Sequence, residues 1–265
     1  MKDQIAKFSF KINGGIRWLM WNYLTDPLNL VLVSEFPKSG GTWFSQMLAD
    51  ALNIPFPRNR IPNDTPCLLH GHHLYKKNFG KMIGVVRDGR DIMVSAYHHF
   101  LLKNDKNTDY AINFYRQRVP FDDYDNIEAN MSAFIIYMFE GYAKRPRYFD
   151  WSEFTSQCID DPNICLIKYE DLLKQASEKL NEAISFLGYP SVKEKQLDKI
   201  VEAYSFKNLT KRKPGEESKQ SFLRKGVAGD WKNYFNHESR QVFDQYGGET
   251  LIKLGYEKDN KWVFA

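Results

Sequence analysis

Cysteine is scarce in this sequence. The 265 residues include three, Cys67, Cys158 and Cys165. A small, odd number in a chain of this length excludes a disulfide-rich secreted scaffold and favours a reducing compartment. We therefore expect a cytoplasmic protein whose fold depends on a hydrophobic core.

Long apolar runs are also missing. No stretch approaches the roughly 20 apolar residues that a membrane-spanning helix needs, and Lys2, Asp3 and Lys7 near the start are unlike a signal peptide. We expect no membrane span.

Neither sign of charge is in large excess. The chain has 37 basic and 33 acidic residues, a formal net charge of +4. This balance argues against a nucleic-acid partner but allows local basic pockets for a small anion. Aromatic residues make up 15% of the chain, so flat stacking surfaces are available.

Short apolar runs alternate with helical patterns along the chain. Residues 30–36, 82–87 and 164–169 are rich in Val and Ile and predict buried strands. Helical spacing of apolar residues is found at 42–52, 89–101, 127–143, 175–187 and 238–253. This alternation predicts an α/β fold with a central parallel sheet flanked by helices.

Segments with little apolar periodicity lie between these elements. Residues 53–66, 102–126 and 211–221 are predicted to be irregular. Long loops of this kind often form lids or substrate walls; for 211–221 a solvated connection is an equal alternative. At the N-terminus, residues 8–23 mix aromatic and basic residues, a composition compatible with contact to a membrane surface. Because Gly14-Gly15 interrupts this pattern, we expect a helix or strand packed on the domain instead.

The sequence FPKSGGTW at residues 36–43 predicts an anion-binding loop. A buried strand leads into Pro37, the glycines permit a tight turn, and Thr42 opens a helix whose N-terminal amides favour anions. Lys38 precedes the glycines, whereas the lysine of a nucleotide-triphosphate loop follows them. Trp43 offers a platform for a nucleotide base.

Two further motifs carry phosphate-binding residue types. In GVVRDGRDIMVSAYHH, Arg87 stands at the carboxyl end of a strand, where open α/β sheets bind ligands, and Ser95 lies one helical turn beyond Asp91. In RKGVAGDWKNYF, two cations, Arg224 and Lys225, precede a glycine. Each motif alone is compatible with a structural role.

The three motifs together, in this order, strongly resemble the PAPS-dependent cytosolic-type sulfotransferase family, in which PAPS is 3'-phosphoadenosine 5'-phosphosulfate. The resemblance spans about residues 30–255 and suggests a bacterial member. It implies a three-layer α/β sandwich with a P-loop-like phosphosulfate-binding loop, formed by a single sulfotransferase domain over residues 1–265 with residues 1–28 as an accessory segment. It also implies PAPS as donor, 3',5'-ADP as product and no metal.

The family's donor contacts fall on defined positions here. The resemblance assigns the 5'-phosphosulfate to Lys38, Ser39, Gly40, Gly41 and Thr42, the adenine to Trp43, Tyr169 and Phe206, and the 3'-phosphate to Arg87, Ser95, Arg224, Lys225 and Gly226. Tyr204 stands where the family often has Thr.

The segment CLLHGHHLYKKN at 67–78 carries the candidate base. In the family this segment contains Lys-Thr-His, and the His is the base; aligned in this way, His72 is the base and His70 replaces the Lys. A neutral imidazole accepts a proton near neutral pH, and residues 70 and 72 share one face of a strand. His73 would point away and has a structural role. Glu35 is the second candidate base.

Three other interpretations of these residues are weaker than the sulfotransferase interpretation. Cys67, His70, His72 and His73 cluster in the sequence, but strand alternation divides them, so a zinc site is the weaker interpretation. A P-loop kinase or NTPase conflicts with the position of Lys38, and a non-catalytic nucleotide-binding module has no need of a base.

The acceptor and the oligomeric state stay open. Aromatic residues in the expected acceptor walls suit a small-molecule, lipid or carbohydrate acceptor alike. The family's dimer motif would start at Lys232, but Asn236, His237 and Gln241 occupy its later positions.

Overall fold

A computed structural model describes the backbone of residues 2–264 and the side chains of residues 12–264. The chain divides into two compact units. Unit 1 comprises the described residues up to Glu35 together with Gly40–Val85 and Asp160–Tyr204, and unit 2 comprises Phe36–Ser39, Val86–Ile159 and the described residues from Ser205 onward.

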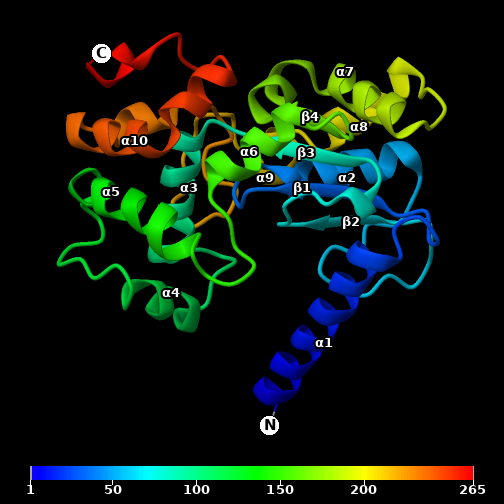
Figure 1. Cartoon of the computed structure of the whole chain (residues 1–265), viewed down its shortest axis with the longest axis horizontal. Helices are drawn as coiled ribbons and strands as arrows, with labels where there is room; N and C mark the ends of the chain where they lie inside the picture. Colours follow the sequence, from blue (N-terminus) through cyan, green and yellow to red (C-terminus); the bar gives the residue numbers. More distant parts are fainter. Residues whose placement is uncertain (1, 265) are drawn as a thin grey trace. The chain divides into compact units, whose positions relative to one another are not determined.

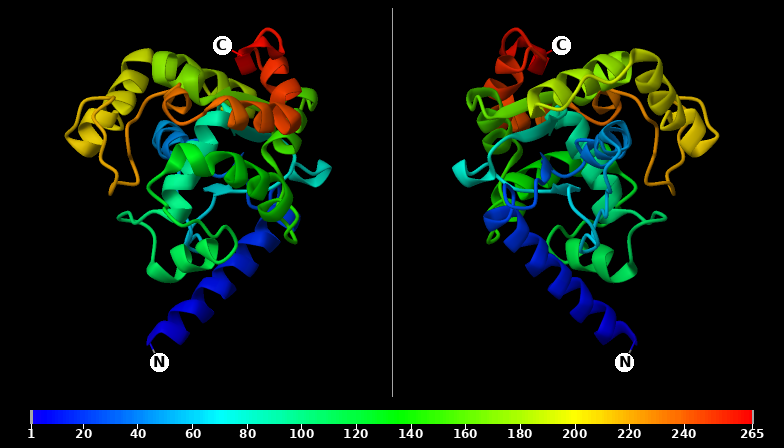
Figure 2. Two further views of the ribbon diagram at one scale, coloured as in Figure 1. Left: turned by 90° about the vertical axis from the view of Figure 1, so that its left-hand side faces the viewer. Right: turned by 90° about the vertical axis from the view of Figure 1, so that its right-hand side faces the viewer.

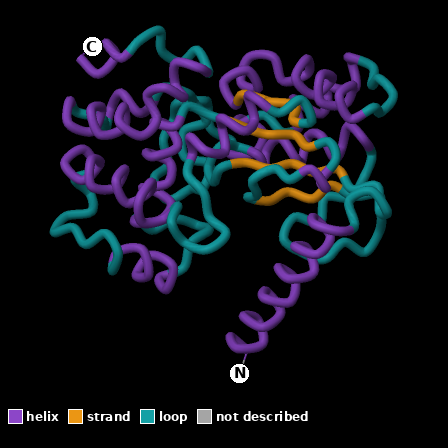
Figure 3. Tube along the Cα trace, viewed as in Figure 1, coloured by secondary structure: helices purple, strands orange, loops and turns teal. Residues whose placement is uncertain are grey.

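A four-stranded sheet in the order β2-β1-β3-β4 forms the centre of the fold (Figure 3). Its strands are β1 (Val31–Glu35), β2 (Leu68–Gly71), β3 (Met82–Val86) and β4 (Ile164–Lys168). The sheet is all-parallel, and β1 pairs with both β2 and β3. The predicted parallel sheet is therefore confirmed, as are the three predicted strands.

Three helices of unit 1 pack their apolar side chains against this sheet: α2 (Gly41–Leu52), α7 (Tyr169–Leu187) and α8 (Glu194–Ala203), labelled in Figure 1. One hydrophobic cluster joins strand residues such as Val33 and Ile83 to Phe44 and Met47 of α2. The helix predicted to begin at residue 175 begins at Tyr169, with non-helical backbone at Gln175.

The first helix, α1 (Lys2–Tyr23), is continuous through Gly14-Gly15, and Figure 2 shows it as one unbroken rod. Of the two expected forms, helix or strand, this segment is a helix, and its two glycines weaken it without ending it. The Arg17 side chain, which is 9% exposed, donates hydrogen bonds to the carbonyls of His70 and Arg60. The C-terminal part of α1 thereby supports the end of β2.

Unit 2 is mainly helical. It contains α3 (Gly89–Leu101), α4 (Asp109–Arg116), α5 (Ile127–Ile136), the π-helix η2 (Tyr137–Tyr142), α6 (Trp151–Asp160), α9 (Phe206–Thr210), η3 (Asp230–Asn233), α10 (His237–Lys253) and η4 (Asn260–Phe264). In unit 1, η1 (Lys77–Phe79) is a single turn.

Two sequence predictions in unit 2 need correction. The segment 102–126, predicted to be irregular, contains α4, whose N-terminus is capped by the Thr108 side chain. The helix predicted over 127–143 changes to π geometry at Tyr137. Within this turn, a Cβ added to Gly141 would lie 2.6 Å from the Tyr137 ring. The predicted irregular segments 53–66 and 211–221 contain no helix or strand.

Candidate active site

The carboxyl ends of β1 and β2 bring a carboxylate and two histidines together in unit 1. Val33 of β1 is in register with His70 of β2, and Glu35 ends β1. The Glu35 Oε1 atom lies 3.0 Å from His70 Nε2. The Gly41 amide donates to Glu35 Oε2 at 2.5 Å. His72 Nδ1 lies 3.0 Å from the Glu35 carbonyl oxygen.

Glu35 is ionised in this environment. Burial alone would raise the pKa of its carboxyl group, but the hydrogen bond from His70, the nearby His70 and His72 rings and the Gly41 amide together lower that pKa below its ordinary value. Both carboxylate oxygens are therefore acceptors, and each has a hydrogen-bond partner.

The next histidine, His73, packs away from this group. Its ring centroid lies 4.5 Å from that of Trp21, and its amide donates to the Ser34 hydroxyl. Burial, with smaller contributions from neighbouring positive groups, lowers the pKa of His73 to about 4. His73 is neutral near pH 7, as expected for a structural residue.

The loop after β1 has an unusual backbone conformation at its lysine. Lys38 has φ +80°, in the left-handed region that non-glycine residues seldom adopt. Such conformations cost of the order of 1–3 kcal/mol and cluster at ligand-binding sites. In unit 2, Ser39 directs its hydroxyl and its amide to the Phe36 carbonyl, which tightens the turn.

The Lys38 side chain lies in an aromatic setting within unit 2. Its Nζ atom is 3.7 Å from the centroid of the Phe222 ring, and His99 packs edge-on against the same ring. Burial, and secondarily the Lys38 charge, lowers the pKa of His99 to about 3. The ammonium group therefore makes a cation–π contact with the Phe222 ring.

The remainder of the loop packs on aromatic residues of unit 1. Gly40 has φ +94°, and a Cβ there would lie 2.7 Å from the Tyr169 ring. Trp43 packs edge-on against Tyr169, and its indole N–H donates to the Tyr204 carbonyl at 2.8 Å. The Tyr204 hydroxyl donates to Asp50 at 2.8 Å. Tyr204 thus supports Trp43 through its backbone, an interaction that does not depend on the identity of its side chain.

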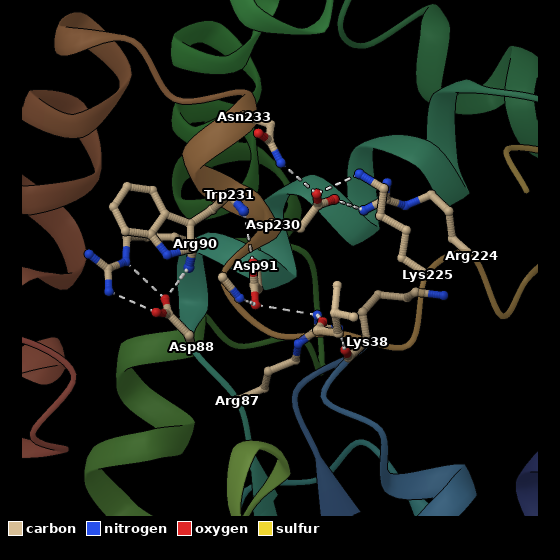
Figure 4. Close-up of polar contacts among 12 residues, drawn as sticks. Lys38, Arg87, Asp88, Arg90, Asp91, Arg224, Lys225, Asp230, Trp231 and Asn233 are labelled. Carbon is tan, nitrogen blue, oxygen red and sulfur yellow. Dashed lines mark hydrogen bonds and ion pairs between the residues drawn. The ribbon is translucent and has the colours of Figure 1, made fainter. Parts of the chain in front are cut away.

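In unit 2, Arg87 is held by a buried carboxylate (Figure 4). Arg87 Nη2 lies 3.4 Å from Asp91 Oδ2. The same aspartate accepts hydrogen bonds from the Gly229 and Trp231 amides at 2.7 and 2.9 Å. Burial raises the pKa of Asp91, and Arg87 and the two amides oppose that rise. Asp91 therefore ties α3 to the segment that carries Arg224 and Lys225.

A second cation cluster gathers around Asp230, as Figure 4 shows. Arg224 and Lys225 both pair with Asp230, the lysine at 2.6 Å, and Arg224 also pairs with Glu217 at 2.6 Å. Burial opposes ionisation of Asp230, but the hydrogen bonds from Lys225 and Arg224 lower its pKa overall. The two acidic residues align Arg224 and Lys225 and balance their two positive charges, and the third cation of the family assignment, Arg87, lies in the same unit.

The glycine after these cations makes a close approach to an aromatic ring. Gly226 has φ +65°, and a Cβ there would lie 2.3 Å from the Phe206 ring. Phe206 begins α9 behind the Ser205 cap. Two residues that the sequence pattern assigns to one nucleotide are therefore in direct contact. Ser95 lies on α3, one turn beyond Asp91.

Sequence reasoning missed several members of these clusters. Asp230, Glu217, Phe222 and His99 all touch a candidate cation or its neighbour, and Asp91 was noted only for its spacing. The Asp in GDW was a usable signal, because a buried basic pair needs a carboxylate. The partner role of Glu217, in the charged segment 211–221, had no such signal.

The described part of the chain lacks both a cluster of metal ligands and a helix that could span a membrane. No group of three or more His, Cys, Asp or Glu side chains there is arranged to hold a metal ion. Among residues 2–264, no helix is long and apolar enough to cross a bilayer.

Comparison with known proteins identifies the family. The family model described as "Sulfotransferase domain" matches residues 68–255. The chain belongs to the sulfotransferase family. It is 26% identical to sulfotransferase 1B1 of Canis lupus familiaris over 83% of this chain and 84% of that protein. It is 25% identical to human sulfotransferase 2A1 over 86% of each chain.

Solved sulfotransferase structures share the fold of this family member. Mouse sulfotransferase SULT7A1, complexed with PAP, superposes with a TM-score of 0.58 at 21% identity, covering 88% of this chain and 86% of that one. Retinol dehydratase, in a complex with retinol and PAP, superposes with a TM-score of 0.57 at 19% identity, covering 84% of this chain and 81% of that one. The predicted α/β sandwich is confirmed.

Proposed function

We propose that this sulfotransferase moves a sulfonate group from PAPS to a hydroxyl or amine acceptor, with His72 as general base. The observation that carries the assignment of the base is the contact between His72 Nδ1 and the Glu35 carbonyl. A carbonyl oxygen only accepts, so Nδ1 carries the proton and Nε2 is the basic nitrogen. His72 is also exposed, which suits a group that meets an acceptor.

The proposed reaction balances as a direct transfer. His72 Nε2 takes the proton of the acceptor O–H or N–H, and the acceptor atom forms a bond to sulfur. The bond between sulfur and the bridging phosphate oxygen breaks, and its electron pair stays on the phosphate, giving 3',5'-ADP. Lys38 stabilises the charge that develops on that oxygen. Its left-handed backbone and its cation–π contact with the Phe222 ring support this role.

The donor contacts proposed for the rest of the site follow the family assignment. The 5'-phosphosulfate contacts Lys38, Ser39, Gly40, Gly41 and Thr42; the adenine contacts Trp43, Tyr169 and Phe206; and the 3'-phosphate contacts Arg87, Ser95, Arg224, Lys225 and Gly226. The close packing at Gly40 and Gly226 supports this set, because both glycines let the backbone approach where a side chain would not fit.

We propose that residues 1–265 act as a single sulfotransferase domain, with residues 1–28 as an accessory segment, in the cytoplasm. The acceptor is a small molecule, a lipid or a carbohydrate. The solved relative retinol dehydratase binds retinol in one complex and androsterone in another, which supports an apolar alcohol as the first acceptor class to test.

Ligand-dependent melting tests the donor assignment. We expect 3',5'-ADP to raise the melting temperature at concentrations where 5'-AMP and ATP do not, because the basic groups of unit 2 recognise the 3'-phosphate. A ligand at one hundred times its Kd stabilises the folded state by about 2.7 kcal/mol, which corresponds to a rise of several degrees for a chain of this size.

Lys225→Ala gives the matched variant for this experiment. Its ammonium group pairs with Asp230 and Glu217, and the pairing of Arg224 with both carboxylates survives its removal. The variant should keep its unliganded melting temperature within a few degrees and lose most of the preference for 3',5'-ADP over 5'-AMP. Equal stabilisation of the wild-type protein by all three nucleotides would refute the proposed donor.

A further inference from the structure

Glu35 is the common partner of three groups in unit 1. Its carboxylate accepts from His70 at 3.0 Å through Oε1 and from the Gly41 amide at 2.5 Å through Oε2, and its carbonyl oxygen lies 3.0 Å from His72 Nδ1. Glu35 is 4% exposed. One residue therefore contacts the candidate base, the histidine at the family's lysine position, and the first amide of α2.

The Glu35 carboxylate also caps α2. The residue before this helix, Gly40, provides no side-chain cap, and the first turn of α2 contains no acidic residue. The first amides of a helix need acceptors, and a negative charge is stabilising at that end. Glu35 supplies both from the end of β1.

Glu35, His70 and Gly41 form a close-packed group. A Cβ added to Gly41 would lie 2.8 Å from Glu35 Cδ and 2.9 Å from His70 Nε2. Gly41 therefore admits the carboxylate and the ring directly against its Cα. A larger residue at position 41 would require the other two to move.

This arrangement bears on which groups can act in catalysis. A carboxylate with a lowered pKa and two bound donors is a poor proton acceptor. The His70 ring shares its Nε2 proton with that carboxylate, so the pair carries a net charge of zero at most.

We propose that Glu35 is a positioning residue: its carboxylate fixes the His70 ring and the N-terminus of α2, its backbone carbonyl fixes the His72 ring, and Lys38 is left as the cation for the leaving group. The role of Glu35 in catalysis rests on the proposed function. Its hydrogen bonds and the close-packed group do not depend on that proposal. The proposal assigns His70 to the support of the site, in place of the lysine chemistry of other family members.

Nitrogen-15 NMR of the histidine rings in the ligand-free protein tests the hydrogen bonds without any assay of activity. Above the pH at which the rings lose their second proton, His72 should show a protonated Nδ1 and an unprotonated Nε2, and His70 a protonated Nε2. His72→Gln and His70→Gln assign the signals. A protonated Nε2 on neutral His72 would overturn the proposal, whatever the donor of the reaction proves to be.

Introducing Gly41→Ala into two backgrounds, wild type and Glu35→Ala, tests the close-packed group. Gly41→Ala should lower the melting temperature substantially in the wild-type background and less in Glu35→Ala, because the carboxylate that it strikes is gone. Gly15→Ala is the control, since a Cβ there meets nothing within 4 Å. If Gly41→Ala lowered the melting temperature equally in both backgrounds, the proposed close-packed group would be wrong.

Kinetics of Glu35→Gln separate a positioning role from a base. The amide keeps one acceptor and places its NH₂ against a donor, so one of the two carboxylate bonds is lost. We expect kcat to fall by about 10- to 100-fold, the usual cost of losing an orienting partner. The acid limb of kcat/KM should also move to lower pH, because the negative charge that favours the protonated His72 ring is gone.

Glu35→Gln gives a different result if Glu35 is itself the base. If Glu35 is the base, Glu35→Gln abolishes transfer at every pH while His72→Ala retains it, and the proposed positioning role is then wrong. If the wild-type protein shows the expected ring protonation but transfers no sulfonate from PAPS, the proposed function is wrong and the positioning role is not.

Discussion

His72→Ala should abolish sulfonate transfer while binding of 3',5'-ADP stays nearly unchanged. The imidazole is expected to act on the acceptor proton, and general bases contribute about 10²- to 10⁴-fold to the rate. His72 is exposed; its Nδ1 contacts the Glu35 carbonyl, and its ring packs edge-on against His70. Single-turnover transfer from PAPS gives the rate, and calorimetric titration with 3',5'-ADP gives the affinity.

His237→Ala is the control for this substitution. His237 is also exposed, and it lies at the start of α10, where its ring packs against Phe264. This variant should transfer sulfonate at the wild-type rate. A His72→Ala protein with substantial turnover would contradict the assignment of the base.

Lys38→Ala should reduce turnover by about 10²- to 10³-fold, the cost of losing one group that stabilises developing charge. Binding of 3',5'-ADP should weaken much less, because the bridging oxygen gains most of its negative charge in the transition state. The left-handed backbone at Lys38 adds a structural consequence: Lys38→Gly, with the same loss of charge and no Cβ, should be the more stable of the two variants.

Lys103→Ala is the matched loss of a lysine. Lys103 is exposed and pairs with exposed Asp109 at 2.5 Å, and such pairs contribute little to stability. This control should behave as wild type. If Lys38→Ala lost nucleotide affinity in proportion to its rate, the lysine would serve binding in general and not the leaving group.

The sheet could be predicted from the sequence because its strands are short, continuous apolar runs. Residues 30–36, 82–87 and 164–169 predicted β1, β3 and β4 to within a residue at each end. Only β2, at Leu68–Gly71, could not be read from periodicity, since its two leucines are too few to form a pattern. α4 was missed because its eight residues contain one buried position, Ile112.

The candidate site could be predicted one motif at a time, but the partners of its residues could not. The glycines at 40 and 226 signal close backbone approach, yet the rings that approach them, Tyr169 and Phe206, come from distant segments. Glu35 was predicted as a second base because a carboxylate beside the loop has the required chemistry. Its hydrogen bonds depend on the parallel register of β1 and β2, which no local pattern encodes.

The central claim, transfer of sulfonate from PAPS, is tested most directly with PAPS labelled in the sulfonate group and a library of phenols, alkyl and steroid-like alcohols, amines and sugars, read by mass spectrometry. We predict that wild-type protein labels at least one acceptor class with stoichiometric formation of 3',5'-ADP, and that His72→Ala labels none. Labelled acceptor in equal yield from wild type and His72→Ala, or transfer of a phosphate from ATP with none of sulfonate from PAPS, would contradict the account.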